Sequence, residues 1–301
     1  MKLAPIVLFV YNRPSHTKRT VEALQKNELA RESKLFVYCD NAKNEDSLES
    51  VDDVRSYVDT IDGFKKVTVI KRERNWGLAA SIIDGVTKTV GEYGRVIVLE
   101  DDLVASPYFL KFMNDGLNIF EKREDIFSIT GFNFPEKQLK IPSNYKDEIY
   151  LSYRCMSWGW ATWKDKWYKV DWDVKDFDMF SHDTDKIKLF NRGGEDLFPM
   201  LQNQLNGEID SWAIRFCFGH SVNNAYCVYP VKSLINNEGF DGSGVHCGVD
   251  KSNKFKNELL DNIAPKINKN VLINKEIIDN FYLINKKSFF RRVKNLIRRY
   301  I

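Results

Sequence analysis

Residues 95–102 read RVIVLEDD, an apolar run followed directly by three acids. The apolar part, 96–99, is short and largely β-branched, which predicts a strand buried on both faces. Glu100, Asp101 and Asp102 follow it, and ligands of α/β sheets bind just beyond the carboxyl ends of the strands. Adjacent carboxylates repel one another unless a cation lies between them, and their oxygens suit Mg²⁺ or Mn²⁺. The other interpretation is a solvated acidic turn that caps the next helix.

Strand-like and helix-like stretches alternate on both sides of this run, from the N-terminus to residue 131. A helix from 106 to 120 is expected, with Ser106 as its N-cap and Pro107 as its first residue. Repeated β-α units of this length predict an α/β fold with a mostly parallel, doubly wound central sheet. The expected strands are 5–11, 35–39, 66–71, 96–99 and 127–130, and the expected helices are 15–26, 46–61, 79–90 and 106–120.

Polar residues follow four of these expected strands, at 12–13, at 40, at 72–75 and at 100–102. Because the carboxyl ends of parallel strands meet at one edge of a sheet, these groups are expected to converge there, as a nucleotide site requires. No G-x-G-x-x-G follows the first strand, which argues against a dinucleotide-binding oxidoreductase. The P-loop pattern G-x-x-x-x-G-K-[ST] is also missing from the sequence, which argues against a P-loop NTPase.

The composition is that of a soluble globular protein, with 43% hydrophobic and 29% charged residues in 301. No stretch approaches the ~20 apolar residues of a membrane span. The run 3–11 is too short for a signal peptide with its cleavage site and is expected to be the first strand. The five cysteines are odd in number and contain no C-x-x-C pair, which favours the reducing cytoplasm over a disulfide framework or a structural zinc site.

Charge is spread unevenly, because residues 286–301 hold seven of the 45 Lys and Arg and none of the 42 Asp and Glu. The rest of the chain is therefore net acidic, and no nucleic-acid partner is expected. Apolar residues of this tail recur at helical spacing, which predicts a basic amphipathic helix. Such a helix lies in the interface of an anionic membrane surface, although an apolar stripe can also dock on a protein's own core.

Residues 132–285 differ in character from the first half. They contain six of the seven tryptophans and a glycine-rich loop, 239–246. We expect this half to pack on the sheet and to complete the site. Aromatic rings stack on apolar faces of sugars, but clustered aromatics more often form core. At most one of Trp158, Trp160 and Trp163 is therefore expected to contact a sugar.

Four segments in order resemble GT-A glycosyltransferases: 100–102 (EDD), 158–163 (WGWATW), 209–215 (IDSWAIR) and 233–246 (SLINNEGFDGSGVH). The triplet is similar to the E-D-D of the inverting N-acetylglucosaminyltransferase I group. The other three look like segments of bacterial surface-polysaccharide sugar transferases. The resemblance spans about residues 5–250 and implies a GT-A, Rossmann-like nucleotide-sugar-binding fold. It implies a nucleotide-sugar-binding half (1–131) and an acceptor-binding and catalytic half (132–285), and the basic helix predicted from the charge and periodicity of the tail (286–301) follows them.

The resemblance implies an enzyme that uses Mn²⁺ or Mg²⁺ and inverts the anomeric centre. It would move a sugar from a nucleotide-diphosphate sugar, most simply a UDP-sugar, to a glycan acceptor in surface-polysaccharide synthesis. The acceptor would be lipid-linked or otherwise held at the inner membrane face. A sugar-phosphate nucleotidyltransferase shares this layout, but that class has a glycine-rich basic loop where this chain has Tyr11-Asn12-Arg13-Pro14. A third alternative is a carbohydrate-binding or membrane-adaptor protein of the same fold without catalysis.

The resemblance also implies roles for individual residues. Asp102 is the expected metal ligand, with Asp101 the next candidate on the donor side. His246 matches a third ligand in many GT-A enzymes but not clearly in the N-acetylglucosaminyltransferase I group, so it is either a metal ligand or a loop residue that binds a phosphate. Asp210 lies where the family has its catalytic base, and it is alternatively an N-cap of the helix that follows. Asp196, in a Glu-Asp pair, is the rival base.

Three more residues are expected to bind the donor. Asp40 matches a residue that contacts the base or ribose, and it is alternatively a turn or helix cap. Arg13 follows the first strand and could bind the pyrophosphate through its guanidinium. Asn75 resembles a donor-side turn residue and could equally be only the turn before a helix.

Overall fold

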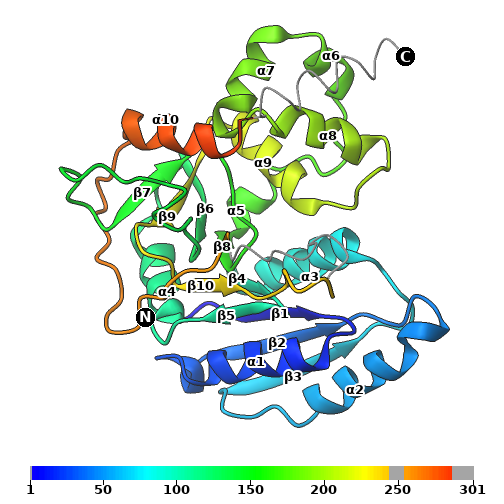
Figure 1. Ribbon diagram of the computed structural model, residues 1–301. Coiled ribbons are helices and arrows are strands. Elements are labelled where there is room, and N and C mark those ends of the chain that lie inside the picture. Colours follow the sequence, from blue (N-terminus) through cyan, green and yellow to red (C-terminus); the bar gives the residue numbers. More distant parts are fainter. Residues whose placement is uncertain (1, 244–253, 287–301) are drawn as a thin grey trace.

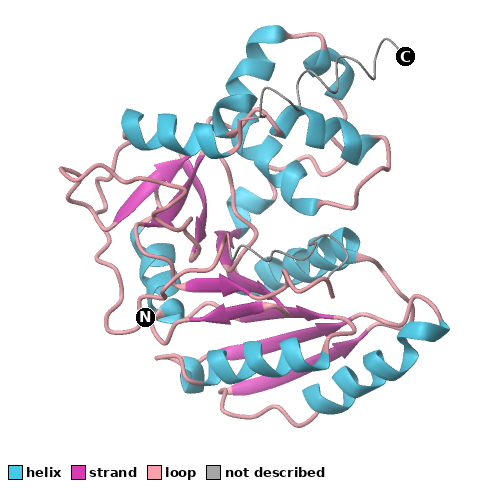
Figure 2. Cartoon of the chain, in the orientation of Figure 1, coloured by secondary structure: helices cyan, strands magenta, loops and turns pink. Residues whose placement is uncertain are grey.

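The computed structural model describes residues 2–243 and 254–286, and an eight-stranded sheet runs through them in the order β3-β2-β1-β4-β8-β6-β9-β7 (Figure 2). Strands β3, β2, β1 and β4 are parallel to one another, β6 is parallel to β9, and β8 and β7 are antiparallel to their neighbours. The mostly parallel central sheet predicted from the sequence is confirmed. The strands are β1 (Ile6–Val10), β2 (Lys34–Cys39), β3 (Lys66–Lys71), β4 (Arg95–Glu100), β6 (Ile126–Thr130), β7 (Ile149–Ser152), β8 (Trp160–Trp163) and β9 (Tyr226–Pro230).

Helices cover both faces of this sheet because alternate residues of its strands point to opposite sides. Ile6 and Leu8 of β1 belong to one core cluster with residues of α1, α2, α4 and α10, whereas Val7 and Phe9 belong to a second with residues of α3, α5, α8 and α9. Figure 1 shows α1 and α3 on opposite sides of β1. The helices are α1 (Pro14–Gln25), α2 (Leu48–Val58), α3 (Leu78–Tyr93), α4 (Phe109–Ile119), α5 (Lys164–Trp167), α6 (Phe177–Ser181), α7 (Thr184–Phe190), α8 (Leu197–Leu205), α9 (Trp212–Val222) and α10 (Lys275–Ile284).

A short strand that the sequence did not predict follows the acid triplet. Strand β5 (Leu103–Ala105) pairs antiparallel with β10 (Ile235–Asn237), so a segment from the second half lies beside the acids. The expected helix start at Pro107 is wrong, since α4 begins at Phe109. Ser106 still accepts a hydrogen bond from Tyr108 N through its hydroxyl (3.2 Å). Distant segments also hold this residue, because its N–H donates to Leu234 O (2.8 Å) and its hydroxyl to Leu260 O.

The second half packs on the sheet through α5, α8 and α9, and it also extends the sheet, which the sequence did not predict. Strand β8 inserts between β4 and β6 and is antiparallel to both. Its residues are buried on both faces of the sheet: Trp160 stacks on Trp212 with ring centroids 4.6 Å apart, and Trp163 Nε1 donates to Leu117 O on the other face (2.9 Å). Trp160 and Trp163 are therefore core residues.

The described part of the chain contains no helix that is long and apolar enough to cross a membrane. Its last helix, α10, packs Ile277 and Phe281 into the core. The basic amphipathic helix predicted for 286–301 lies outside the described residues, apart from Lys286.

Candidate functional site

A cleft of about 520 Å³ opens at the carboxyl ends of β1, β2 and β4. The first half of the chain lines it with Arg13, Asp40, Asn75 and the acids of 100–102. The second half lines it with Ser157, Trp158, Met200, Asn237, Ser243 and residues 209–213. Polar groups from the ends of four parallel strands, β1, β2, β3 and β4, therefore meet in one place, and residues of the second half face them.

The acid triplet lies at the end of β4 because the buried strand stops where its backbone turns into β5. Asp101 and Asp102 are both largely buried, at 4% and 7% exposure. Arg13, the residue before α1, contacts both: Nη2 pairs with Asp101 Oδ1 and lies 3.0 Å from Asp102 Oδ2. Thr20 of α1 donates to Asp101 O (2.7 Å), which fixes the helix against the turn.

Three acids and one guanidinium leave an excess of negative charge here. Burial, with Asp102 and Asp101 close by, raises the pKa of Glu100 to about 8. Burial also raises the pKa of Asp101, although Arg13 opposes that shift. Burial disfavours the charged form of Arg13, yet the carboxylates of Asp101 and Asp102 outweigh it and raise the Arg13 pKa.

These residues fit a divalent cation by the chemistry of their donor set. Mg²⁺ is usually held by one or two carboxylates together with substrate phosphates, and Asp101 and Asp102 supply two carboxylates at the edge of the cleft. Asp102 Oδ2 also packs closely on Gly239, where a Cβ would lie 2.1 Å from it. No group of three or more His, Cys, Asp or Glu that could hold a metal ion is found within 2–243 and 254–286. His246 lies outside those ranges.

Asp40 directly follows β2 and lines the cleft, but its carboxylate accepts hydrogen bonds from the backbone of the turn before α3. Oδ1 accepts from Trp76 N (2.8 Å) and Asn41 N (2.9 Å), and Oδ2 accepts from Gly77 N (3.0 Å). Asn75 in the same turn donates from Nδ2 to Asn41 O (2.7 Å). Both residues therefore shape the wall of the cleft. All of these contacts are explained by the alternative role predicted for the two residues, which is to form the turn.

Asp210 also lines the cleft, and it caps a different helix from the one expected. Ser211 is the N-cap of α9, and its side chain accepts from Ile214 N. Asp210 Oδ2 instead accepts from Ala79 N in the first turn of α3 (3.1 Å), where the cap residue Gly77 has no side chain to do so. A carboxylate at a helix N-terminus interacts favourably with the helix dipole. This contact joins the second half of the chain to the donor-side wall.

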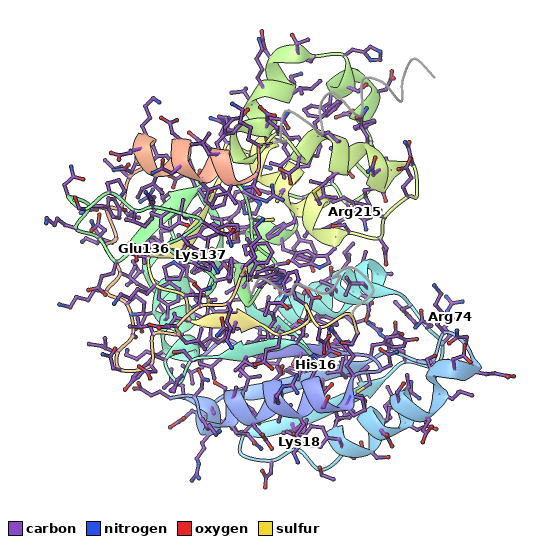
Figure 3. All side chains as sticks on the ribbon, viewed as in Figure 1. His16, Lys18, Arg74, Glu136, Lys137 and Arg215 are labelled. Carbon is purple, nitrogen blue, oxygen red and sulfur yellow. The ribbon has the colours of Figure 1, made fainter. Side chains whose placement is uncertain are left out.

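Asp196 is placed differently. Both of its carboxylate oxygens pair with Arg154, at 2.8 and 2.9 Å, and it is not among the residues that line the cleft. Arg215, the last residue of the IDSWAIR segment, lies on α9 (Figure 3). It is also outside the lining and donates from Nη1 to Trp172 O (3.1 Å).

Among the three candidate tryptophans, only Trp158 lines the cleft. Its ring packs edge-on against Phe132 (4.5 Å between centroids) and Phe240 (5.6 Å). Two further features were not predicted from the sequence. Lys43 lines the cleft three residues after Asp40, and a basic residue soon after a strand end is the signal that could have identified it. Arg72, expected at this edge, is instead buried against α3, where Nη1 pairs with Asp84 (2.7 Å).

Comparison with protein families finds that the model of glycosyl transferase family 2 matches residues 6–169, more than half of the chain. The match covers every parallel strand of the first half together with β8, and it includes the acid triplet. No curated protein matches the chain.

Solved structures with a related arrangement include the mannosyltransferase PcManGT from Pyrobaculum calidifontis, in complex with GDP-Man and Mn²⁺. It shares 9% sequence identity over 54% of this chain and 45% of its own, with a TM-score of 0.38. TarS of S. aureus (1–349) shares 12% identity over 77% of this chain and 59% of its own, with a TM-score of 0.42. The same TarS fragment in complex with UDP has a TM-score of 0.41. The chain thus spans 45–59% of the length of these structures.

Proposed function

The chain belongs to glycosyl transferase family 2 and is a glycosyltransferase of GT-A fold, and from this we propose that it transfers a sugar from a UDP-sugar to a glycan acceptor with inversion at the anomeric carbon. One observation supports this most strongly. Asp102, at the end of β4, and Asp210, before α9, line the same cleft although 108 positions separate them in the sequence. An inverting transfer needs both a site for the leaving diphosphate and a separate carboxylate as base.

Asp102, with Asp101 beside it, would hold Mn²⁺ or Mg²⁺ in this enzyme. The bound cation would neutralise the negative charge that develops on the leaving nucleoside diphosphate. Asp101 is engaged by Arg13 through both Nη2 and Nε, so Asp102 is the better candidate for direct ligation. His246 is proposed as a further ligand or as a phosphate contact of the same group.

Donor binding is proposed for the wall formed by Arg13, Asp40 and Asn75. Arg13 would bind the diphosphate, because a guanidinium can donate hydrogen bonds to two phosphate oxygens at once. Asp40 and Asn75 would act chiefly by fixing the turn from 75 to 77, whose backbone faces the cleft. In this proposal residues 1–131 bind the donor and residues 132–285 bind the acceptor, and strands of both halves belong to one sheet.

Asp210 is proposed as the base that takes the proton from the acceptor hydroxyl as that hydroxyl attacks the anomeric carbon. Asp210 is exposed and lines the cleft. Its carboxylate accepts a hydrogen bond from the backbone N–H of Ala79, and this N–H is a donor that cannot itself take the proton of the acceptor hydroxyl. Asp196 would need to leave a bidentate pair with Arg154 and enter the cleft to do the same. Trp158 is the proposed platform for an apolar sugar face on the acceptor side.

A thermal-shift series tests this function directly. UDP-sugars with Mn²⁺ are expected to raise the melting temperature, because a ligand that binds only the native state stabilises it by about 2.7 kcal/mol at 100 times its Kd. GDP-sugars and UDP-sugars without metal should give smaller shifts. Equal shifts for every nucleotide, or none in any combination, would contradict the proposal.

The tail is proposed to hold the enzyme on an anionic membrane surface, where a lipid-linked acceptor is confined. Each basic residue near such a surface contributes about 1 kcal/mol, and salt weakens that contribution. The full chain is expected to co-sediment with vesicles that contain anionic lipid, and to do so less at high salt.

A chain that ends at Asn285 should not co-sediment, yet it should still transfer sugar to a soluble acceptor, because the cleft and α10 lie before that point. If both chains bound vesicles equally, residues 286–301 would have another role, such as packing on the enzyme itself.

A further inference from the structure

Arg13 fills the space between the two aspartates of the β4–β5 turn. Its Nη2 contacts Asp101 Oδ1 and lies 3.0 Å from Asp102 Oδ2, and its Nε lies 3.4 Å from Asp101 Oδ2. Gly239 closes the site on another side of Asp102, where a Cβ would lie 2.1 Å from Oδ2 and 3.1 Å from Arg13 Nη1. The guanidinium therefore lies where a cation shared by the two carboxylates would lie.

We propose that Arg13 is a positioning residue that takes the place of the divalent cation in the free enzyme and moves to the donor's diphosphate when the cation binds. The inference rests on the proposed function, because it assumes that Asp102 holds a metal. A guanidinium and a divalent cation repel each other and cannot both stay close to Asp102 Oδ2 in a largely buried site.

The side chain of Arg13 is free to make this exchange while its backbone stays fixed. Arg13 O accepts from Thr17 N and from Thr17 Oγ1, both at 2.9 Å, and Pro14 begins α1 directly after it. The side chain is 15% exposed and lines the cleft, so rotation about its own bonds brings the guanidinium into the space for the donor. Paired phosphate oxygens suit it as well as carboxylates do.

Two opposite couplings follow from this exchange. Cation and guanidinium compete for Asp102, so Arg13 lowers the affinity of the free enzyme for metal. A diphosphate in the cleft gives the displaced guanidinium a new partner, so nucleotide raises the affinity for metal. Until then Arg13 keeps the buried acids paired, which limits their mutual repulsion.

The test is a Mn²⁺ titration of the full chain without nucleotide, with free Mn²⁺ measured by its electron paramagnetic resonance signal. Arg13→Gln is expected to bind Mn²⁺ about tenfold more tightly than the unchanged protein, within the ordinary range of coupling between two sites. Addition of UDP should increase the affinity for Mn²⁺ in the unchanged protein by a larger factor than in Arg13→Gln.

Lys18→Gln is the matched control. It removes the same charge five residues further along the chain, but the Lys18 side chain is 61% exposed, and Figure 3 shows it at the outer edge of α1. Its Mn²⁺ affinity should equal that of the unchanged protein. A similar gain in Lys18→Gln would mean that net charge alone causes the effect, and it would overturn the proposal.

A second variant covers the case in which Arg13→Gln does not fold without metal. Arg13→Lys keeps the charge but loses the planar fork, so its affinity for Mn²⁺ should lie between those of the unchanged protein and Arg13→Gln. Mn²⁺ should also raise the melting temperature of both Arg13 variants by more than it raises that of the unchanged protein.

Two results overturn the inference and are distinguishable from each other. If the unchanged protein binds Mn²⁺ and the Arg13 variants bind it equally or more weakly, Arg13 does not compete with the cation, and the proposed metal site stands. If no variant binds Mn²⁺ with or without UDP, the proposed metal site fails together with this inference.

Discussion

Asp102→Ala is expected to lower kcat by about three orders of magnitude while the protein stays folded. The reason is that a metal acting as Lewis acid lowers the barrier by several kcal/mol, and each 1.36 kcal/mol changes the rate tenfold. The fold should tolerate the change because Arg13 keeps its contacts with Asp101, and the backbone contact from Glu238 N to Asp102 O (2.8 Å) remains. Steady-state transfer from a UDP-sugar, with circular dichroism as the check on folding, measures both quantities.

Asp115→Ala is the control for this experiment. Asp115 lies on α4 and pairs with Lys111 at 2.8 Å, and it does not line the cleft. Its removal should leave kcat unchanged, because this partly exposed ion pair lies outside the cleft and ion pairs near the surface contribute only about 0–1 kcal/mol to stability. Full activity of the unchanged enzyme in excess chelator would contradict the role given to Asp102.

Asp210→Asn is expected to lower kcat by roughly 10²–10⁴-fold, the usual size of a general-base contribution. The amide oxygen can still accept from Ala79 N, so the first turn of α3 keeps its cap and the cleft its shape. Because the change affects only the proton acceptor, the affinity for UDP and Mn²⁺ should be nearly unchanged. Single-turnover transfer together with a UDP binding isotherm separates these two effects.

Asp196→Asn is the matched comparison, since it makes the same chemical change in the rival base. Its expected effect is on stability, because the guanidinium of Arg154 would lose the charge of its bidentate partner. If Asp196→Asn were inactive but folded and Asp210→Asn remained active, the assignment of the base would be wrong. The product anomer, read by NMR, should be inverted relative to the donor, and retention would rule out the mechanism.

Local sequence pattern was enough to predict the first half of the fold. Apolar runs at 6–10, 34–39 and 95–100 form parallel strands, and the polar residues directly after them line one cleft. Alternating burial and helical spacing depend only on neighbours within a few residues, so the chain itself carries this information. The boundaries moved by a few residues, as at Phe109, where α4 begins two residues after the expected start. Ser106 still accepts a hydrogen bond from Tyr108 N, but its hydroxyl also donates to the distant Leu260 O.

Tertiary structure alone decided the arrangement of the second half. The sequence predicted that at most one of Trp158, Trp160 and Trp163 contacts a sugar, but it did not indicate which one. Insertion of β8 between β4 and β6 buries Trp160 and Trp163, and among these three only Trp158 lines the cleft. Likewise, no pattern around Asp210 shows that it caps α3 instead of α9. These outcomes depend on which segments pair across 30 or more residues.

The pairing of Arg13 with Asp101 and Asp102 was also decided by the tertiary structure. The sequence indicated that Arg13 and residues 100–102 each follow a strand, and therefore that they share an edge of the sheet. It did not indicate that the guanidinium would lie between Asp101 and Asp102, because that position is set by the β1–β4 pairing and by the turn into β5. Residue types and periodicity determined which groups stand at the edge, and long-range packing decided which of them touch.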